Sequence, residues 1–272
     1  MSYRRILTIQ DISCLGQCSL TVALPILSAC GVETCVLPSA VLSSHTGGFK
    51  DPHFRDLTED MPAIAEHWKR EGITFDGILT GYLGSVRQID YVKQIFDSLT
   101  GEGGKIVVDP AMADHGKLYK GFDNNYVIAM KHLCTKADVV IPNLTEVCML
   151  TGLPYGETDP ETAVKKLHEM EIPNVILTGV SKNPDTTGIL VSEKGKMRYY
   201  SHRKISKSYH GTGDIFAAAF MGAWMRDKEL FEAGKVAAEF TSGCIAHTYR
   251  NPAHWYGVKF EEALPELMEA LQ

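Results

Sequence analysis

The segment from His210 to Phe220 combines residue types that could bind and transfer a phosphoryl group. Gly211 and Gly213 precede a run of apolar, helix-forming residues, and glycine lets the backbone approach an anion closely. The helix N-terminus would direct unpaired N–H groups and the positive end of its dipole at that anion. Asp214, in the first turn, could accept a proton from an attacking hydroxyl. The pattern favours phosphoryl transfer, and the alternative is a plain helix start capped by Thr212 or Asp214.

Two better-known nucleotide motifs do not fit this segment. The dinucleotide fingerprint needs a third glycine at the position that Phe216 occupies. A phosphate-binding loop of the Walker type needs Gly-Lys followed by Ser or Thr, and the sequence contains no such run.

Asn143 and Glu146 form a second candidate group. If a helix opens at Asn143, both side chains lie on one face of its first turn. An amide and a carboxylate could hold a hydrated Mg²⁺, which keeps several of its waters and takes few protein ligands. The alternative, which the pattern alone favours, is an N-cap with Glu at the third helical position.

The loop from Asp109 to Tyr119 carries two carboxylates, Asp109 and Asp114, just after a predicted strand. They could order waters bound to magnesium, and the polar run from Asp114 to Lys120 could be a mobile cover. The alternative is a strand end followed by an ordinary turn at Asp114-His115-Gly116.

Polar groups also follow predicted strands in the N-terminal half. They supply hydrogen-bonding groups and one aromatic ring, which would suit a small polar ring substrate. Each also has a structural explanation, such as a surface-loop histidine or a half-buried tyrosine with a satisfied hydroxyl. These residues are Asp11, Ser44, His45, Thr46 and Tyr82.

The elements that must position these residues alternate between strand and helix. Hydrophobic runs and turn residues predict strands at 5–10, 33–40, 75–80, 105–109, 137–141 and 174–177, and helices at 19–30, 62–71, 86–99, 125–135, 144–151 and 160–170. A hairpin is predicted at 187–192 and 196–202, followed by helices from Gly211, over 230–249 and from about 260. This order predicts an α/β fold with a mostly parallel sheet, helices on both faces and an antiparallel edge. Ligands then bind at the carboxyl ends of the strands, and four candidates follow strand ends: Asp11, Asp109, Asn143 and Thr178.

Composition excludes several classes of protein. The 272 residues are 44% hydrophobic and 22% charged, with a net charge of −6, so we expect a globular protein without the basic patch of a nucleic-acid-binding surface. No apolar run approaches the roughly 20 residues that span a bilayer, and the N-terminal apolar stretch is too short for a signal peptide. The seven cysteines contain no C-x-x-C pair. We therefore expect a cytoplasmic protein with reduced thiols and no membrane partner.

Taken together, the motifs resemble those of the ribokinase-like superfamily. Its C-terminal signature is similar to Gly211-Thr212-Gly213-Asp214, and its N-x-x-E magnesium motif is similar to residues 143–146. Within the superfamily, the pyridoxal kinase branch is similar at residues 9–10, 44–46, 81–85 and 109–114. The resemblance spans nearly the whole chain. It implies one ribokinase-like kinase domain over residues 1–272, a three-layer α/β/α sandwich whose central sheet is mostly parallel.

The resemblance also implies an activity and a set of roles. The activity is ATP-dependent phosphorylation of the 5′-hydroxymethyl group of a vitamin B6 vitamer, by a homodimer that uses Mg²⁺ and a monovalent cation such as K⁺. Asp214 would be the catalytic base, and Gly211, Thr212 and Gly213 would form the anion hole. The vitamer would contact Asp11, Ser44, His45, Thr46 and Tyr82. ATP would contact Asp109, Asp114, Asn143, Thr178, Lys204, Gly211 and Gly213, and the metal site would comprise Glu146, Asn143 and Asp109.

One position departs from the branch pattern, which commonly has Ser where this chain has Asp11. A carboxylate there would favour pyridoxamine or protonated pyridoxine over pyridoxal. Two alternatives stay open: a hydroxymethylpyrimidine kinase of the same fold, and a non-catalytic protein that binds vitamin B6.

Overall fold

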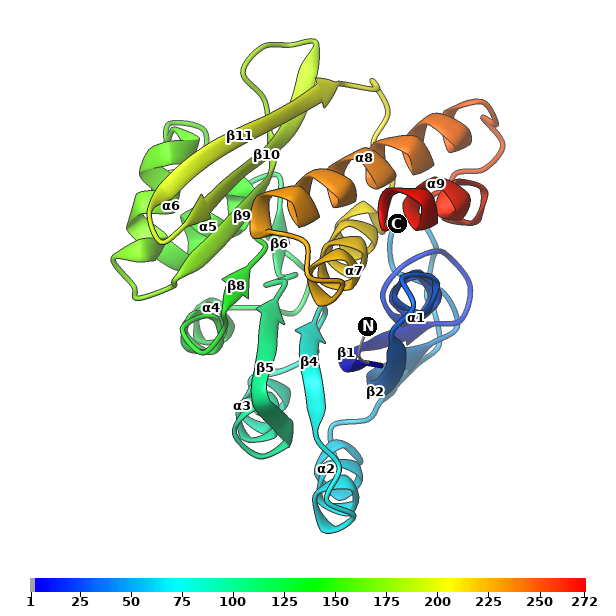
Figure 1. The fold of residues 1–272 in the computed structure, drawn as a ribbon, viewed down its shortest axis with the longest axis vertical. Coiled ribbons are helices and arrows are strands. Elements are labelled where there is room, and N and C mark those ends of the chain that lie inside the picture. The colour runs from blue at the N-terminus through cyan, green and yellow to red at the C-terminus, as the bar shows by residue number, and fades with distance from the viewer. Residues whose placement is uncertain (1–2) are drawn as a thin grey trace.

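One nine-stranded sheet runs through residues 3–272, the part of the chain that the computed structural model describes. Its strand order is β11-β10-β9-β8-β5-β4-β1-β2-β3 (Figure 1). The six central strands pair in parallel: β2 (Glu33–Leu42), β1 (Arg5–Ser13), β4 (Phe75–Thr80), β5 (Thr100–Val108), β8 (Val139–Val140) and β9 (Asn174–Val180). The edge strands pair antiparallel: β10 (Thr186–Glu193), β11 (Lys196–Arg203) and β3 (Phe54–Asp56). The predicted fold class is confirmed.

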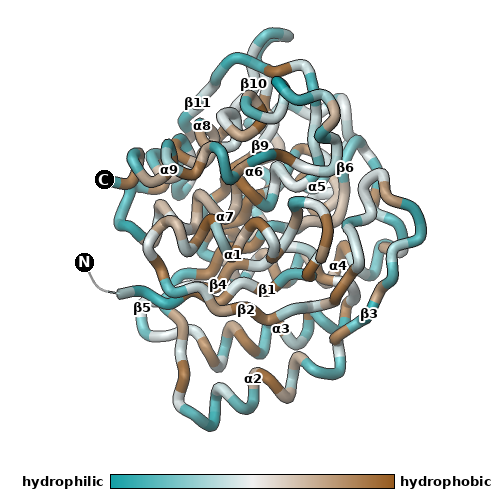
Figure 2. The backbone as a smooth tube through the Cα atoms, turned by 90° about the vertical axis from the view of Figure 1, so that its right-hand side faces the viewer, coloured by the Kyte–Doolittle hydropathy of each residue, from teal (hydrophilic) through white to brown (hydrophobic). Residues whose placement is uncertain are grey.

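Helices cover both faces of the sheet. One face carries α1 (Leu20–Ala29), α7 (Thr212–Met225), α8 (Leu230–Tyr249) and α9 (Leu264–Ala270), which follows the 3₁₀ turn η1 (Phe260–Ala263). The other face carries α2 (Met61–Arg70), α3 (Val86–Leu99), α4 (Asn124–Cys134), α5 (Leu144–Thr151) and α6 (Pro160–His168). Figure 2 shows the hydrophobic stretches gathered around the sheet and the hydrophilic ones mainly along the outside.

Strand alternation divides the core into two layers. Ile6 packs in the layer under α1 and α7, whereas Leu7 and Ile9 pack in the layer under α2–α6, because successive side chains of a strand point to opposite faces. The helix α7 is apolar on nearly all sides and almost entirely buried, as expected for a helix enclosed by its neighbours.

Local signals explain where several helices begin or end. Ser85 and Asp159 accept hydrogen bonds from backbone N–H groups in the first turns of α3 and α6, which satisfies donors that a helix start leaves unpaired. Gly152 ends α5 in the left-handed conformation, with φ of 75°, where glycine has no steric penalty.

Several details differ from the sequence-based expectations. The strand expected at 105–109 begins at Thr100, although three glycines between 101 and 104 read as a turn. The strand β8 has only two residues, and β9 continues to Val180. The helix expected from Phe260 splits into η1 and α9. The short strands β3, β6 (Ala113–Asp114) and β7 (Lys117–Leu118) were not predicted, because two or three residues carry no readable periodicity.

The carboxyl ends of the parallel strands meet at one edge of the sheet, where the loops after β1, β4, β5, β8 and β9 converge. The N–H of Asp109 donates to the carbonyl of Thr80, and that of Thr178 donates to the carbonyl of Pro142. Within the described residues, no helix is both long and apolar enough to cross a membrane.

Candidate active site

The N-terminus of α7 opens into a cavity of about 460 Å³ at this edge. Gly211 precedes the helix in the left-handed conformation, with φ of 79°. A Cβ at this position would lie 1.9 Å from the carbonyl oxygen of Gln17, so only glycine fits. The first helical hydrogen bond runs from the N–H of Ile215 to the carbonyl of Gly211 at 3.0 Å. The N–H groups of residues 212–214 precede that bond and are available to an anion.

Asp214 stands in this first turn and is partly buried. Its Oδ2 accepts a hydrogen bond from the N–H of Ser19 at 2.9 Å. Burial raises the pKa of Asp214 to about 7; the Ser19 N–H opposes this rise, and the nearby Asp11 adds to it. A carboxyl group with a pKa near neutrality, beside an anion site, has the properties of a general base.

Asp11, at the end of β1, lies close to Asp214 but points its carboxylate at serines. Its Oδ1 accepts from Ser19 Oγ at 2.6 Å and its Oδ2 from Ser13 Oγ at 2.9 Å. The side chain is buried, and burial raises its pKa above the ordinary value while the two hydroxyls lower it. Both oxygens of Asp11 therefore already have partners within the protein.

Asn143 and Glu146 form a capping box at the start of α5. Asn143 Oδ1 accepts from the N–H of Glu146 at 3.0 Å, and Glu146 Oε2 accepts from the N–H of Asn143 at 2.8 Å. Glu146 Oε1 accepts from the N–H of Met112 at 3.2 Å, and Asn143 Nδ2 donates to the carbonyl of Ala113 at 2.9 Å. These bonds fix the loop after β5 against the start of α5.

Three carboxylates gather around this loop and the α7 terminus. Burial raises the pKa of Glu146, and burial together with the charges of Glu146 and Asp214 raises the pKa of Asp109 well above its ordinary value. Asp109 Oδ2 lies 3.9 Å from the place that a Cβ at Gly213 would occupy. Buried carboxylates that repel each other are a setting that a cation would stabilise.

The donor set determines what kind of metal this setting fits. No cluster of three or more His, Cys, Asp or Glu side chains within residues 3–272 has the geometry to ligate a metal directly. Mg²⁺ requires no such cluster, because it keeps waters and binds through one or two carboxylates and substrate phosphates. Glu146 and Asp109 therefore fit a water-mediated Mg²⁺ site, and their existing hydrogen bonds leave lone pairs free for those waters.

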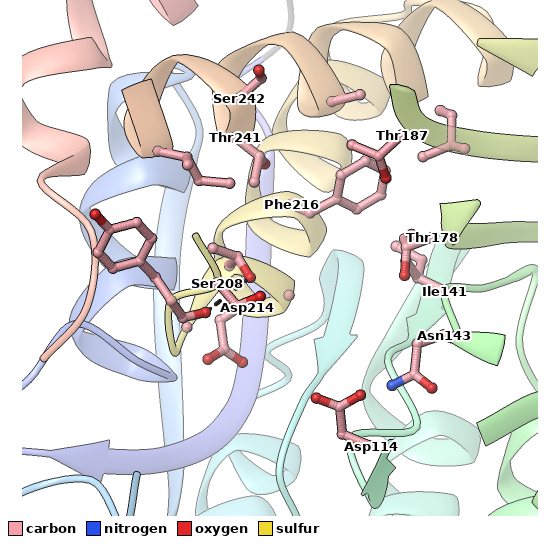
Figure 3. A pocket seen from close by; sticks show the side chains of 18 of the residues that line it. Asp114, Ile141, Asn143, Thr178, Thr187, Ser208, Asp214, Phe216, Thr241 and Ser242 are labelled. Atoms are coloured by element: carbon pink, nitrogen blue, oxygen red, sulfur yellow. Dashed lines mark hydrogen bonds between the residues drawn. The ribbon is translucent and has the colours of Figure 1, made fainter. Parts of the chain in front are cut away.

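Both polar and apolar side chains line the rest of the cavity, which would suit a nucleotide. Figure 3 shows Asp214 on one side, Asp114 and Asn143 on the other, and Phe216, Thr187, Thr241 and Ser242 farther along. Thr178 and Lys204, both predicted to contact ATP, also line the wall. All the residues assigned to catalysis, ATP or metal therefore border one cavity.

The predicted cover segment folds as the hairpin β6–β7. The N–H of Gly116 donates to Thr145 Oγ1 at 3.1 Å, and a Cβ at Gly116 would lie 2.8 Å from the Tyr155 ring. Tyr119, at the end of this segment, lines the cavity, and burial and four surrounding carboxylates raise the pKa of its phenol. In this structure, the segment rests against the start of α5.

The predicted vitamer-binding residues do not line this cavity. His45 is buried, and both ring nitrogens have backbone partners: Nδ1 accepts from the N–H of Gly47 at 3.0 Å, and Nε2 donates to the carbonyl of Tyr256 at 2.9 Å. Thr46 is exposed and Ser44 is buried. Tyr82 is half-buried and stacks on Phe122, with ring centres 5.7 Å apart. Their contact with a vitamer remains a prediction.

Sequence reasoning missed the segment 254–261, which holds the N-terminal loops in place. His254 Nε2 bonds to Gln17 Oε1 at 2.8 Å, and Gln17 Nε2 donates to Glu261 Oε2 at 3.0 Å. The Tyr256 carbonyl accepts from both His45 and the Gln17 N–H. No local sequence signal indicates such contacts, since the partners lie more than 200 residues apart.

Sequence reasoning also missed Ser19. A serine directly before a helix is typical of an N-cap, but Ser19 makes no side-chain cap hydrogen bond to α1. Its hydroxyl contacts Asp11 and its N–H contacts Asp214 instead.

Solved structures resemble this chain over nearly its whole length. A candidate phosphomethylpyrimidine kinase from Bacteroides thetaiotaomicron has a TM-score of 0.93 and 35% sequence identity, covering 98% of this chain and 94% of that chain. A second crystal form of that protein, with pyridoxal, has a TM-score of 0.90 and covers 98% of this chain and 96% of that one, again at 35% identity. Pyridoxal kinase from Lactobacillus plantarum has a TM-score of 0.93 at 33% identity and covers 98% of both chains.

Sequence comparison agrees with the structures. A curated relative, the pyridoxal kinase of Dictyostelium discoideum, is 27% identical over 240 residues, which are 82% of this chain and 79% of that protein. The family described as phosphomethylpyrimidine kinase matches residues 26–258. The chain therefore belongs to the phosphomethylpyrimidine kinase family.

Proposed function

We propose that this protein is a pyridoxal kinase, which uses ATP to phosphorylate the 5′-hydroxymethyl group of a vitamin B6 vitamer. The observation that carries the proposal is Asp214: a carboxyl group with a pKa near 7, placed beside the free N–H groups of a helix start, at the border of a cavity of about 460 Å³. A base and an anion site in that arrangement are what transfer of phosphoryl to an alcohol requires.

The identity of the alcohol is supported by the relatives. The Lactobacillus plantarum and Dictyostelium discoideum proteins are pyridoxal kinases, and the Bacteroides thetaiotaomicron structure contains pyridoxal. Vitamin B6 vitamers carry a primary alcohol on a flat polar ring. Tyr82 and the buried loop residues Ser44 and His45 follow strands β4 and β2, at the edge of the sheet where the carboxyl ends of the parallel strands meet.

The mechanism follows from the placement of these groups. The vitamer hydroxyl approaches Asp214, whose free oxygen accepts the proton as the bond from the hydroxyl oxygen to the γ-phosphorus of ATP forms. The bond from that phosphorus to the bridging oxygen breaks, and ADP leaves with the electron pair. The N–H groups of Thr212 and Gly213 donate to the oxygens of the transferring phosphoryl, where negative charge must be stabilised. Because these donors are fixed by the backbone, they need no rearrangement during the reaction.

We propose that Glu146 and Asp109, with Asn143 holding Glu146 in place, organise Mg²⁺ through water. When bound, Mg²⁺ supplies positive charge to the phosphate oxygens. Its charge would also offset the burial and the neighbouring carboxylate charges that raise the pKa values of Glu146 and Asp109. The requirement for K⁺ or another monovalent cation is a proposal that depends on the ribokinase-like resemblance.

The proposal extends to ATP contacts at Thr178, Lys204 and Asp114, to a homodimer and to a cytoplasmic location. The lining of the cavity supports the ATP contacts. All seven cysteines lie within the described residues and are free, which supports a reducing compartment. The homodimer depends on the ribokinase-like resemblance.

A hydroxymethylpyrimidine kinase is the second candidate, and the family comparison favours it specifically. The matching family is described as phosphomethylpyrimidine kinase, and the hydroxymethylpyrimidine/phosphomethylpyrimidine kinase of Bacillus subtilis is 26% identical over 217 residues, which are 77% of each chain. Hydroxymethylpyrimidine is also a small heteroaromatic primary alcohol, so the same base and anion site would serve it.

Steady-state ADP release with pyridoxal, pyridoxine, pyridoxamine and hydroxymethylpyrimidine tests the proposal. We expect turnover on at least one B6 vitamer with a kcat/KM above that on hydroxymethylpyrimidine, and a 5′-phosphate identified by phosphorus NMR. The reverse order would favour the second candidate. Vitamer binding without ADP release, with Mg²⁺ and K⁺ supplied, would indicate a non-catalytic binding protein.

A further inference from the structure

Ser19 adopts a backbone conformation that residues with side chains rarely adopt. Its φ is 53° and its ψ is −131°, values typical of glycine at the first central position of a type II′ turn. The residue is buried, with 5% of its surface exposed. Strain of this kind persists only where surrounding contacts impose it, so the contacts of Ser19 need an explanation.

Ser19 forms a backbone bridge with Ile12 of β1, and two further contacts hold it to two different carboxylates. The Ser19 hydroxyl donates to Asp11 Oδ1 at 2.6 Å, and the Ser19 N–H donates to Asp214 Oδ2 at 2.9 Å. On the far side, Asp11 Oδ2 accepts from Ser13 Oγ at 2.9 Å. A short hydrogen bond from a hydroxyl to a carboxylate is among the stronger kinds in proteins. The four side chains and one backbone N–H form a continuous chain that ends at Asp214.

We propose that Ser19 is a positioning residue for Asp214, and that Asp11 acts on Asp214 through it. Asp11 holds the Ser19 hydroxyl, the hydroxyl holds the backbone, and the backbone N–H fixes one oxygen of Asp214. The other oxygen is thereby directed to the reacting hydroxyl. This inference rests on the proposed function, in which Asp214 is the base.

The alternative explanations of Ser19 account for less. An N-cap role is excluded because the hydroxyl makes no cap bond to α1. A role in the turn alone would be filled better by glycine, which adopts positive φ without penalty. The Ser19 N–H and Asp11 also shift the pKa of Asp214 in opposite directions, so both act on the same carboxyl group.

A double-mutant experiment tests the chain of contacts. We expect Ser19→Ala and Asp11→Ala each to lower kcat by roughly 10- to 100-fold, because a displacement of about 1 Å has effects of that order. The KM for ATP should stay within about twofold, and the double variant should be no worse than either single one, since both act in one chain. Ser28→Ala, an exposed serine near the end of the same helix, is the matched control.

The Asp214→Ala background separates positioning from general damage. In that background, Ser19→Ala and Asp11→Ala should change the residual kcat by less than about twofold, because the group they position is gone. If either substitution lowers the residual kcat of Asp214→Ala by the same factor as it lowers the wild-type kcat, the proposal is overturned. If only Asp11→Ala lowers the residual kcat in the Asp214→Ala background, Asp11 contacts the substrate directly, and the proposal is likewise overturned.

A Ser19→Gly variant and crystal structures of the alanine variants provide two further tests. Glycine suits the conformation and retains the N–H, so this variant should fold, and it should lose kcat because the link to Asp11 is missing. Wild-type kcat in Ser19→Gly would overturn the proposal. If the wild-type protein phosphorylates none of the four alcohols, the proposed function fails, and crystal structures still decide the positioning. If crystal structures of Ser19→Ala and Asp11→Ala show the Asp214 carboxylate in its wild-type orientation, the positioning proposal is overturned.

Discussion

Gly211→Ala should damage both stability and activity, for reasons that the structure separates. The first is backbone conformation: with φ of 79°, an alanine there is disfavoured by about 1–2 kcal/mol. The second is overlap: the new Cβ would lie 1.9 Å from the Gln17 carbonyl oxygen, whereas ordinary contacts begin at 3.4 Å. The start of α7 or the loop at Gln17 must therefore move by about 1.5 Å, the difference between these two distances. A displacement of that size at the anion site should lower kcat by roughly 100-fold.

A matched control isolates the overlap from the backbone effect. Gly72 also has a positive φ, 67°, and a Cβ there would meet nothing within 4 Å. Gly72→Ala should therefore lower the melting temperature by about 2–8 °C, from 1–2 kcal/mol at 2–4 °C per kcal/mol, with kcat unchanged. Gly211→Ala should fall below this control in melting temperature and also lose activity.

Thermal melts and steady-state ADP release on both variants provide the measurement. If Gly211→Ala melts within about 2 °C of Gly72→Ala and keeps more than about half of the wild-type kcat, the overlap argument is wrong. The start of α7 would then have a freedom to move that its burial against α1 and α8 contradicts.

Three further predictions concern the carboxylates and the cap. Asp214→Asn should lower kcat by roughly 10²–10⁴ while ATP still binds; a near-normal kcat would remove Asp214 from the base role. In the ligand-free protein, Asp214 keeps its proton up to about pH 7, against an ordinary pKa of 3.8, so the folded state holds more protons between these values. The free energy of unfolding should then fall as pH rises through this window. The melting temperature of Asp214→Asn should exceed that of the wild type most above pH 7, and the two melting temperatures should converge below pH 4. Asn143→Ala should lower stability by about 1 kcal/mol through loss of the cap and should raise the KM for Mg-ATP. The control Asp159→Ala, which removes the cap of α6, should lower stability alone. Equal KM values in the two variants would contradict the role of Asn143.

The sequence predicts the fold class and many of the residues that border the cavity because both depend on local signals. Alternation of strand and helix patterns fixes which residues follow the carboxyl ends of strands, and parallel strands bring those ends together. Asp109 and Asn143 follow strands and border one cavity, as predicted. Thr178 borders it too but lies within β9, whereas Asp11, the fourth residue expected after a strand end, lies within β1 and does not border it. The capping box at Asn143 and Glu146 is equally local, since its two residues are three positions apart.

The contacts of the residues expected to bind the vitamer could not be predicted in the same way, because they join distant parts of the chain. His45 has the residue type of a ligand-binding group, but its Nε2 bonds to a carbonyl 211 positions away. Asp11 departs from the branch pattern as a carboxylate, yet its oxygens accept from Ser13 and Ser19. The preference for a positively charged vitamer, inferred from Asp11, stays a prediction.

The tethers from residues 254–261 to the loops at Gln17 and His45 have a consequence for synthesis. In a nascent chain, the sheet, the anion site and every residue assigned to ATP precede residue 254. The loops at Gln17 and His45 obtain their partners only when His254, Tyr256 and Glu261 have been made. A chain interrupted before residue 254 would lack the partners of both loops, and the loop at Gln17 lies against Gly211 at the start of α7. The last residues to be synthesised therefore fix the surroundings of the anion site as well as those of His45.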